Sequence, residues 1–127
     1  MIRGVRGAIT ISKNEASEIL EQTRRLVLQM AKENDIDPDE VASVIVSTTT
    51  DISAAFPAKA VRTIDGWTYV PVMCTHEMDV PGSMPLCIRV MMHVNTKLAQ
   101  DKIQHVYMND AVKLRPDLSQ KSQVSQA

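Results

Sequence analysis

The stretch that decides the fold is LCIRVMMHVN, residues 86–95. Its apolar and β-branched residues predict a strand, and they fall on both of its faces, so both faces should be covered. Arg89 interrupts this apolar run, although a guanidinium is almost never fully buried without an anionic partner. Arg89 therefore forms an internal salt bridge, reaches solvent at a sheet edge, or lines a site for an anionic ligand.

One long helix is available to cover such a strand. Apolar residues recur at helical spacing from Ile19 to Ala31, which predicts an amphipathic helix of about five turns that ends near Asn34. Asn14 is placed to cap its start. After this helix, Asp37 followed by proline and two acidic residues is typical of the start of a short helical turn.

The remaining elements are read from β-branched runs and turn residues. Four more strands are predicted at residues 2–11, 44–50, 67–74 and 103–108, with a short helix at 56–62 and a loop at 76–85. These elements predict an α+β fold, a mixed five-stranded sheet with one long helix packed on one face. Residues 1–118 form a single domain, and residues 119–127 a flexible polar tail. The uncovered sheet face predicts an oligomer.

The composition excludes several classes of function. The chain has 127 residues, and 14 Lys plus Arg against 15 Asp plus Glu give a net charge of -1, so a general nucleic-acid binder is not expected. Cys74 and Cys87 have no metal-ligand spacing with the three histidines, so we expect no metal site. Without an apolar run of roughly 20 residues or a signal peptide, we expect no membrane contact and a cytoplasmic protein with reduced thiols.

Several other charged residues are candidates for a local anion site, and each has an ordinary alternative. Arg6 lies in the first strand, where it can reach solvent at the strand end. Lys59 and Arg62 share one face of the short helix, which is usually a solvated face. Arg115 precedes a proline in the C-terminal segment, and Glu77 begins the long loop; both positions are ordinarily exposed.

Catalytic motifs of the common kinds are absent from the sequence. There is no nucleophile elbow, phosphate-binding loop, zinc-protease motif or dinucleotide fingerprint. The residues alone therefore predict scattered cations on a small α+β oligomer, with no nucleophile and no cofactor.

Read together, seven stretches resemble the trimeric chorismate mutase family first known from Bacillus. They run from residue 1 to about residue 119 without large gaps: MIRGVRGA at 1–8, FPAKAVR at 56–62, GWTYVPV at 66–72, EMDV at 77–80, CIRVMM at 87–92, HVY at 105–107 and LRPDL at 114–118. One residue departs from the family pattern, because Met73 stands where members can carry threonine.

The resemblance implies an isomerase of phenylalanine and tyrosine biosynthesis, which converts chorismate to prephenate without a cofactor. It also implies a ferredoxin-like, Bacillus chorismate mutase-like sheet and a homotrimer with active sites between subunits. Arg89 would face the ether oxygen of the breaking bond, Arg6 and Tyr107 would bind a carboxylate, and Glu77 and Cys74 would hold the ring hydroxyl. The other implied site residues would wall the ring or add positive potential: Phe56, Ala58, Lys59, Arg62, Val72, Met73, Leu114 and Arg115.

Two alternatives stay open at this point. A trimeric reactive-imine deaminase of similar fold would also use an interface arginine, but it would need an ordered water for hydrolysis. A non-catalytic trimer that binds an anionic metabolite would need no reactive geometry at all. The combination of Glu77, Arg89 and Tyr107 favours the mutase.

Overall fold

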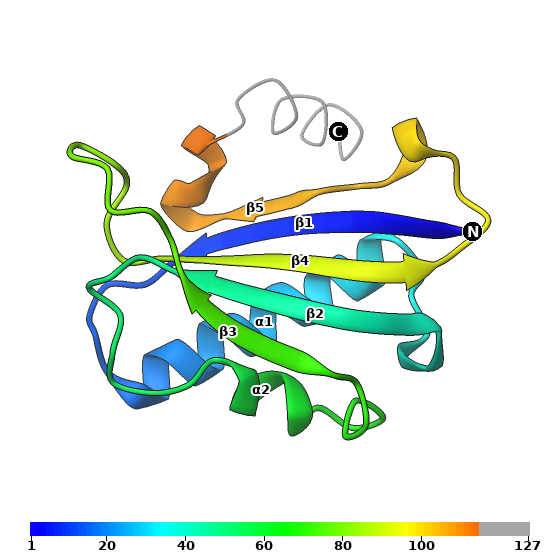
Figure 1. The fold of residues 1–127 in the computed structure, drawn as a ribbon, viewed down its shortest axis with the longest axis horizontal. Helices are drawn as coiled ribbons and strands as arrows, with labels where there is room; N and C mark the ends of the chain where they lie inside the picture. Colours follow the sequence, from blue (N-terminus) through cyan, green and yellow to red (C-terminus); the bar gives the residue numbers. More distant parts are fainter. Residues whose placement is uncertain (115–127) are drawn as a thin grey trace.

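The computed structural model describes residues 1–114 and forms a sheet with its two α-helices on one side (Figure 1). The strands are β1 (Ile2–Thr10), β2 (Val41–Thr48), β3 (Val72–His76), β4 (Cys87–Asn95) and β5 (Val106–Met108). The helices are α1 (Ala16–Glu33) and α2 (Ala58–Arg62), with 3-10 turns at Pro38–Glu40, Gln100–Lys102 and Asn109–Leu114. The predicted mixed five-stranded α+β sheet is confirmed.

The strand order places β4 at the centre of the sheet. The order is β3-β2-β4-β1-β5; β4 runs antiparallel to both neighbours, while β3 is parallel to β2 and β5 is parallel to β1. The unit β1-α1-β2 is therefore split by β4, as in ferredoxin-like sandwiches. No second unit of this kind follows in the described chain, because only a 3-10 turn separates β4 from β5.

The core lies between the sheet and α1. The helix buries Ile19, Leu26, Val27 and Met30 against one sheet face, as its predicted periodicity requires. Gly7 allows this close approach, since a Cβ atom at that position would lie 2.5 Å from the Met30 sulfur. Neither helix covers the opposite face, where Ile45 is 40% exposed and Met73 is 72% exposed. No helix of the described residues is long and apolar enough to span a membrane.

Two expectations about local structure are wrong. Residues 67–70 form a turn, with the Val70 amide donating to the Trp67 carbonyl, because Trp67 is buried in the core and does not join the sheet. The strand itself begins after Pro71, at Val72. Asn14 does not cap α1: Glu15 holds the N-cap position without a side-chain bond.

Other boundaries differ by a few residues, and one cap is confirmed. The strand β2 begins at Val41, and β5 contains only Val106–Met108. Asp37 caps its turn as predicted, since its side chain accepts a hydrogen bond from the Asp39 amide. Arg115 and the tail at 119–127 lie outside the described residues.

Candidate active site

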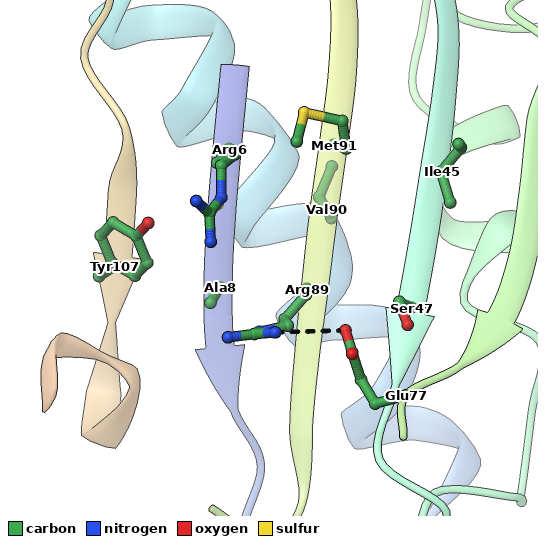
Figure 2. A pocket seen from close by; sticks show the side chains of 10 residues that line it. Arg6, Ala8, Ile45, Ser47, Glu77, Arg89, Val90, Met91 and Tyr107 are labelled. Atoms are coloured by element: carbon green, nitrogen blue, oxygen red, sulfur yellow. Dashed lines mark ion pairs between the residues drawn. The ribbon is translucent and has the colours of Figure 1, made fainter. Parts of the chain in front are cut away.

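A cleft of about 210 Å³ opens on the sheet face that the helices leave uncovered (Figure 2). It contains four of the predicted site residues, Arg6, Glu77, Arg89 and Tyr107. They come from β1, from the loop after β3, from β4 and from β5, so the sheet brings together residues that are far apart in the sequence. The remaining walls are mostly apolar or small: Gly7, Ala8, Ile45, Ser47, Val90 and Met91.

Arg89 lies on the central strand between two small side chains. Its register partners are Ala8 on β1 and Ser47 on β2. Figure 2 shows the guanidinium extending sideways across the sheet near Ala8. Larger side chains at these two positions would occupy the same space, so the small neighbours allow the long arginine to lie along the floor of the cleft.

Glu77 is the partner of Arg89. Their side chains form an ion pair of 3.5 Å, drawn as a dashed line in Figure 2, and they are 28% and 39% exposed. The Glu77 amide donates to the Thr48 carbonyl at 2.8 Å, which fixes the start of the loop. Arg89 thus forms a salt bridge, and that salt bridge faces the cleft. Because a guanidinium has five N–H donors, donors remain for an anionic ligand.

Arg6 and Tyr107 form a second polar group in the cleft. Figure 2 shows the Arg6 guanidinium over β1, on the side of the neighbouring Tyr107 ring. The Arg6 amide donates to His105 Nδ1 at 3.0 Å, which extends the pairing between β1 and β5. The Tyr107 hydroxyl is buried and has no hydrogen-bond partner among residues 1–114. A buried hydroxyl without a partner is unfavourable, and an anion beside Arg6 would satisfy it.

A second hollow of about 380 Å³ lies beside the edge strand β3 and contains Phe56 and Cys74. The Cys74 sulfur accepts a hydrogen bond of 3.3 Å from the Ala58 amide at the start of α2. Cys74 therefore faces the helix layer, whereas Glu77 lines the cleft on the other sheet face. Within one chain, the structure does not bring together the two residues predicted to share the ring hydroxyl.

The other predicted site residues lie outside the cleft. Val72 is half-buried against the core, whereas Met73 is exposed. Lys59 and Arg62 are exposed on α2. Leu114 packs against the small cluster of Ala8, Cys87 and Ala111, which Tyr107 also contacts.

Reasoning from the sequence missed the small and apolar walls of the cleft, above all Ala8, Ser47 and Met91. They carry no charge, and only the pairing register places Ala8 and Ser47 beside Arg89. A weak signal was available within β4, where Met91 shares the face of Arg89 because side chains alternate along a strand.

Cys87 lies two residues before Arg89 on β4, but it does not line the cleft and is not a nucleophile. Burial raises the pKa of the Cys87 thiol to about 11, although the charge of Arg89 opposes this shift. Cys87 is therefore a neutral thiol near pH 7 and not a nucleophilic thiolate. No group of three metal-ligating side chains occurs within residues 1–114.

Comparison with known proteins decides the family. The profile of the family described as chorismate mutase type I matches residues 2–118. The chain belongs to this family. It is 51% identical over 119 residues to a chorismate mutase of Bacillus subtilis (strain 168), with 94% of each chain covered. It is 46% identical to a chorismate mutase of Thermus thermophilus, with 93% of this chain and 97% of the relative covered.

A solved structure gives the same result for this member of the chorismate mutase type I family. The chorismate mutase from Clostridium thermocellum superposes with a TM-score of 0.82 and is 49% identical. The alignment covers 85% of this chain and 96% of the solved one. The family predicted from the sequence motifs is therefore confirmed.

Proposed function

We propose that this member of the chorismate mutase family rearranges chorismate to prephenate at sites shared between the subunits of a homotrimer. The observation that carries the proposal is the composition of the cleft. It holds two arginines and a buried hydroxyl that lacks a partner among residues 1–114, and no cysteine, serine–histidine pair or other nucleophile–base pair is among the residues that line it. Such a cleft suits a reaction of an anion that needs no covalent intermediate.

The reaction makes two demands that the cleft can meet. Chorismate is a dianion, and its rearrangement is a concerted shift in which negative charge develops on the ether oxygen. The protein must hold the compact conformer and stabilise that charge. Arg89, at the centre of the cleft and partly shielded from water, supplies a fixed positive charge whose donors are oriented by Glu77.

Arg6 and Tyr107 bind one substrate carboxylate in this proposal. The carboxylate accepts from the guanidinium and from the Tyr107 hydroxyl, which removes the unfavourable burial of that hydroxyl. Leu114 supports the Tyr107 side of the cleft through the cluster it shares with Ala8.

The neighbouring subunit supplies the second half of the site. Phe56 is 77% exposed beside the hollow that contains Cys74, and Ile45 and Met73 are exposed on the open sheet face. Association that buries these side chains brings Cys74 of one subunit toward Glu77 of the next, where both can bind the ring hydroxyl. The neighbour's remaining residues wall the ring or add positive potential: Phe56, Ala58, Lys59, Arg62, Val72, Met73 and, from the C-terminal segment, Arg115.

A cytoplasmic location belongs to the same proposal. Cys74 and Cys87 are both free thiols, which is the usual state of cysteines in a reducing compartment.

The direct test mixes the purified protein with chorismate and follows the loss of its absorbance, with prephenate identified as the product. We expect turnover without added metal or cofactor. An unchanged rate on changing the solvent to D₂O is expected as well, since the reaction moves no proton. A bell-shaped pH profile for the chemical step, or release of ammonia from an imine substrate, would contradict the proposal and favour the deaminase.

A further inference from the structure

The last residue of β2 and the short segment that follows it are hydrogen-bonded to both ends of the loop that separates Glu77 from Arg89. The Thr48 carbonyl accepts from the Glu77 amide at 2.8 Å, and the Asp51 carboxylate accepts from the Leu86 amide at 3.0 Å. Figure 1 shows the loop and this segment at the same end of the sheet. Residues 48–51 therefore hold both Glu77 and the start of β4, the strand that carries Arg89.

Leu86, the last residue before β4, has a backbone conformation that leucine rarely adopts. Its φ of 49° lies in the left-handed region, which is costly for a side chain with a Cβ atom. It is held from both sides: its amide donates to Asp51, and its carbonyl accepts from the Ile11 amide at 2.9 Å. Removing Asp51 takes away one of these two restraints.

Thr49 connects Asp51 to the first residue of β4. Its hydroxyl donates to the Asp51 carboxylate and accepts from the Cys87 amide at 3.0 Å. The Thr49 amide in turn donates to the Cys87 carbonyl at 3.0 Å. Because Cys87 and Arg89 are two residues apart on the same strand face, a shift of Cys87 is carried directly to Arg89.

We propose that Asp51 is a positioning residue for the rearrangement. Through Leu86 and Thr49 it sets where β4 begins, and so fixes the position of Arg89 relative to Glu77. The inference rests on the proposed function. Asp51 does not line the substrate cleft, so it acts only through the side chains that do.

The experiment compares Asp51→Ala with Asp37→Ala. Asp37 is a matched control, because its carboxylate also accepts from a backbone amide, at 3.0 Å, but at the turn before β2, away from the loop. We expect Asp51→Ala to lower kcat/KM about 10–100-fold, the range produced by small displacements of reacting groups. Asp37→Ala should lose thermal stability only, with kcat/KM within about 2-fold of the wild-type value.

A second comparison separates positioning from a general loss of structure. In a Glu77→Gln background the ion pair is already absent, so Asp51→Ala should cost a clearly smaller factor than in the wild type. Thr49→Val should resemble Asp51→Ala, and Thr49→Ser, which keeps the hydroxyl, should stay close to the wild type. If Asp51→Ala does not fold, the two Thr49 variants decide the question.

Equal losses in the wild-type and Glu77→Gln backgrounds would overturn the positioning role. So would Asp51→Ala activity that matches the Asp37→Ala control, or equal activities of Thr49→Val and Thr49→Ser. A wild-type protein that leaves chorismate unchanged would instead refute the proposed function itself.

Discussion

At the scale of single residues, the position of Arg89 depends on the small size of the two side chains beside it. Ala8 and Ser47 flank it in register and leave space above the sheet, and the guanidinium lies near Ala8 while it forms an ion pair with Glu77 on the Ser47 side (Figure 2). The ion pair faces a cleft and not the core, so Glu77 stays partly hydrated if Arg89 is removed. This arrangement separates the proposed catalytic role of Arg89 from its role in stability.

Arg89→Ala should lower kcat about 10³-fold or more, or about 4 kcal/mol, comparable with the loss of a strong oxyanion donor. Arg89→Lys should recover only part of the rate, because an ammonium lacks the planar fork. The melting temperature should change little in both variants, since the salt bridge is partly exposed. Single-turnover kinetics beside thermal melts measure both effects. An early-melting variant that still converts chorismate at the wild-type rate would disprove the catalytic assignment.

Cys87 should make the stability of the protein depend on pH in the alkaline range. Burial raises its pKa to about 11 from an ordinary value near 9, so between these values the unfolded chain releases a proton that the folded protein retains. The stabilisation is complete below pH 9 and is lost as the pH rises through 11. Melting temperatures of the wild type should therefore fall more steeply from pH 8 to 10.5 than those of Cys87→Ser. Parallel slopes would show that the thiol titrates normally in the folded protein.

At the scale of elements, the close packing of α1 on β1 depends on one glycine, Gly7. The Met30 sulfur would lie 2.5 Å from a Cβ atom at position 7, and a Leu26 methyl carbon 3.1 Å from it. Gly7→Ala should therefore reduce the free energy of unfolding by about 1–3 kcal/mol, the usual cost of overpacking a core. Gly4→Ala is the control on the opposite sheet face, where the nearest atom, the Met91 sulfur, is 3.3 Å away. Urea titrations of the two variants test this, and equal losses would contradict it.

The elements also show which kinds of information the sequence contains. The helix α1 was predictable because its periodicity is local, and Arg6 and Arg89 were visible as charges inside apolar strands. The prediction of a strand at residues 67–74 was partly wrong. Trp67 and Val70 are apolar because they are buried in the core, and they do not pair with a neighbouring strand. The ion pair with Glu77 and the floor around Arg89 depend on the insertion of β4 between β1 and β2, and no local pattern encodes that order.

Asn14 is another residue whose role could not be predicted from the neighbouring sequence. Its sequence context suggested a helix cap, but its side chain accepts from the Ser53 and Ala54 amides. It fixes the segment that leads to Phe56 and the second hollow. Asn14 thus makes hydrogen bonds to a distant segment of the chain instead of the helix cap that its residue type predicts.

At the scale of the whole molecule, the proposed site between subunits predicts that two inactive variants can complement each other. Arg89→Ala removes a group from one half-site, and Phe56→Asp places a carboxylate in the other, where it repels the substrate dianion. In a mixed ring of three subunits, one of the three interfaces then joins two intact halves. Refolding an equal mixture should restore about one quarter of the wild-type activity, which the chorismate assay measures. No recovery, in subunits shown to exchange, would mean that each chain holds a complete site.

The central place of β4 has a consequence for synthesis of the protein on the ribosome. The strand pairs on both sides, with β1 and β2, yet it ends at residue 95, long after β2 ends at residue 48. Translating residues 49–95 takes roughly 2–10 s at about 5–20 residues per second. Throughout this interval the edges of β1 and β2 that will receive β4 have no partner, and such edges promote aggregation of nascent chains. The strand that ends this exposure also carries Arg89, so a chain released before β4 is translated lacks both the central strand of the sheet and the arginine of the proposed site.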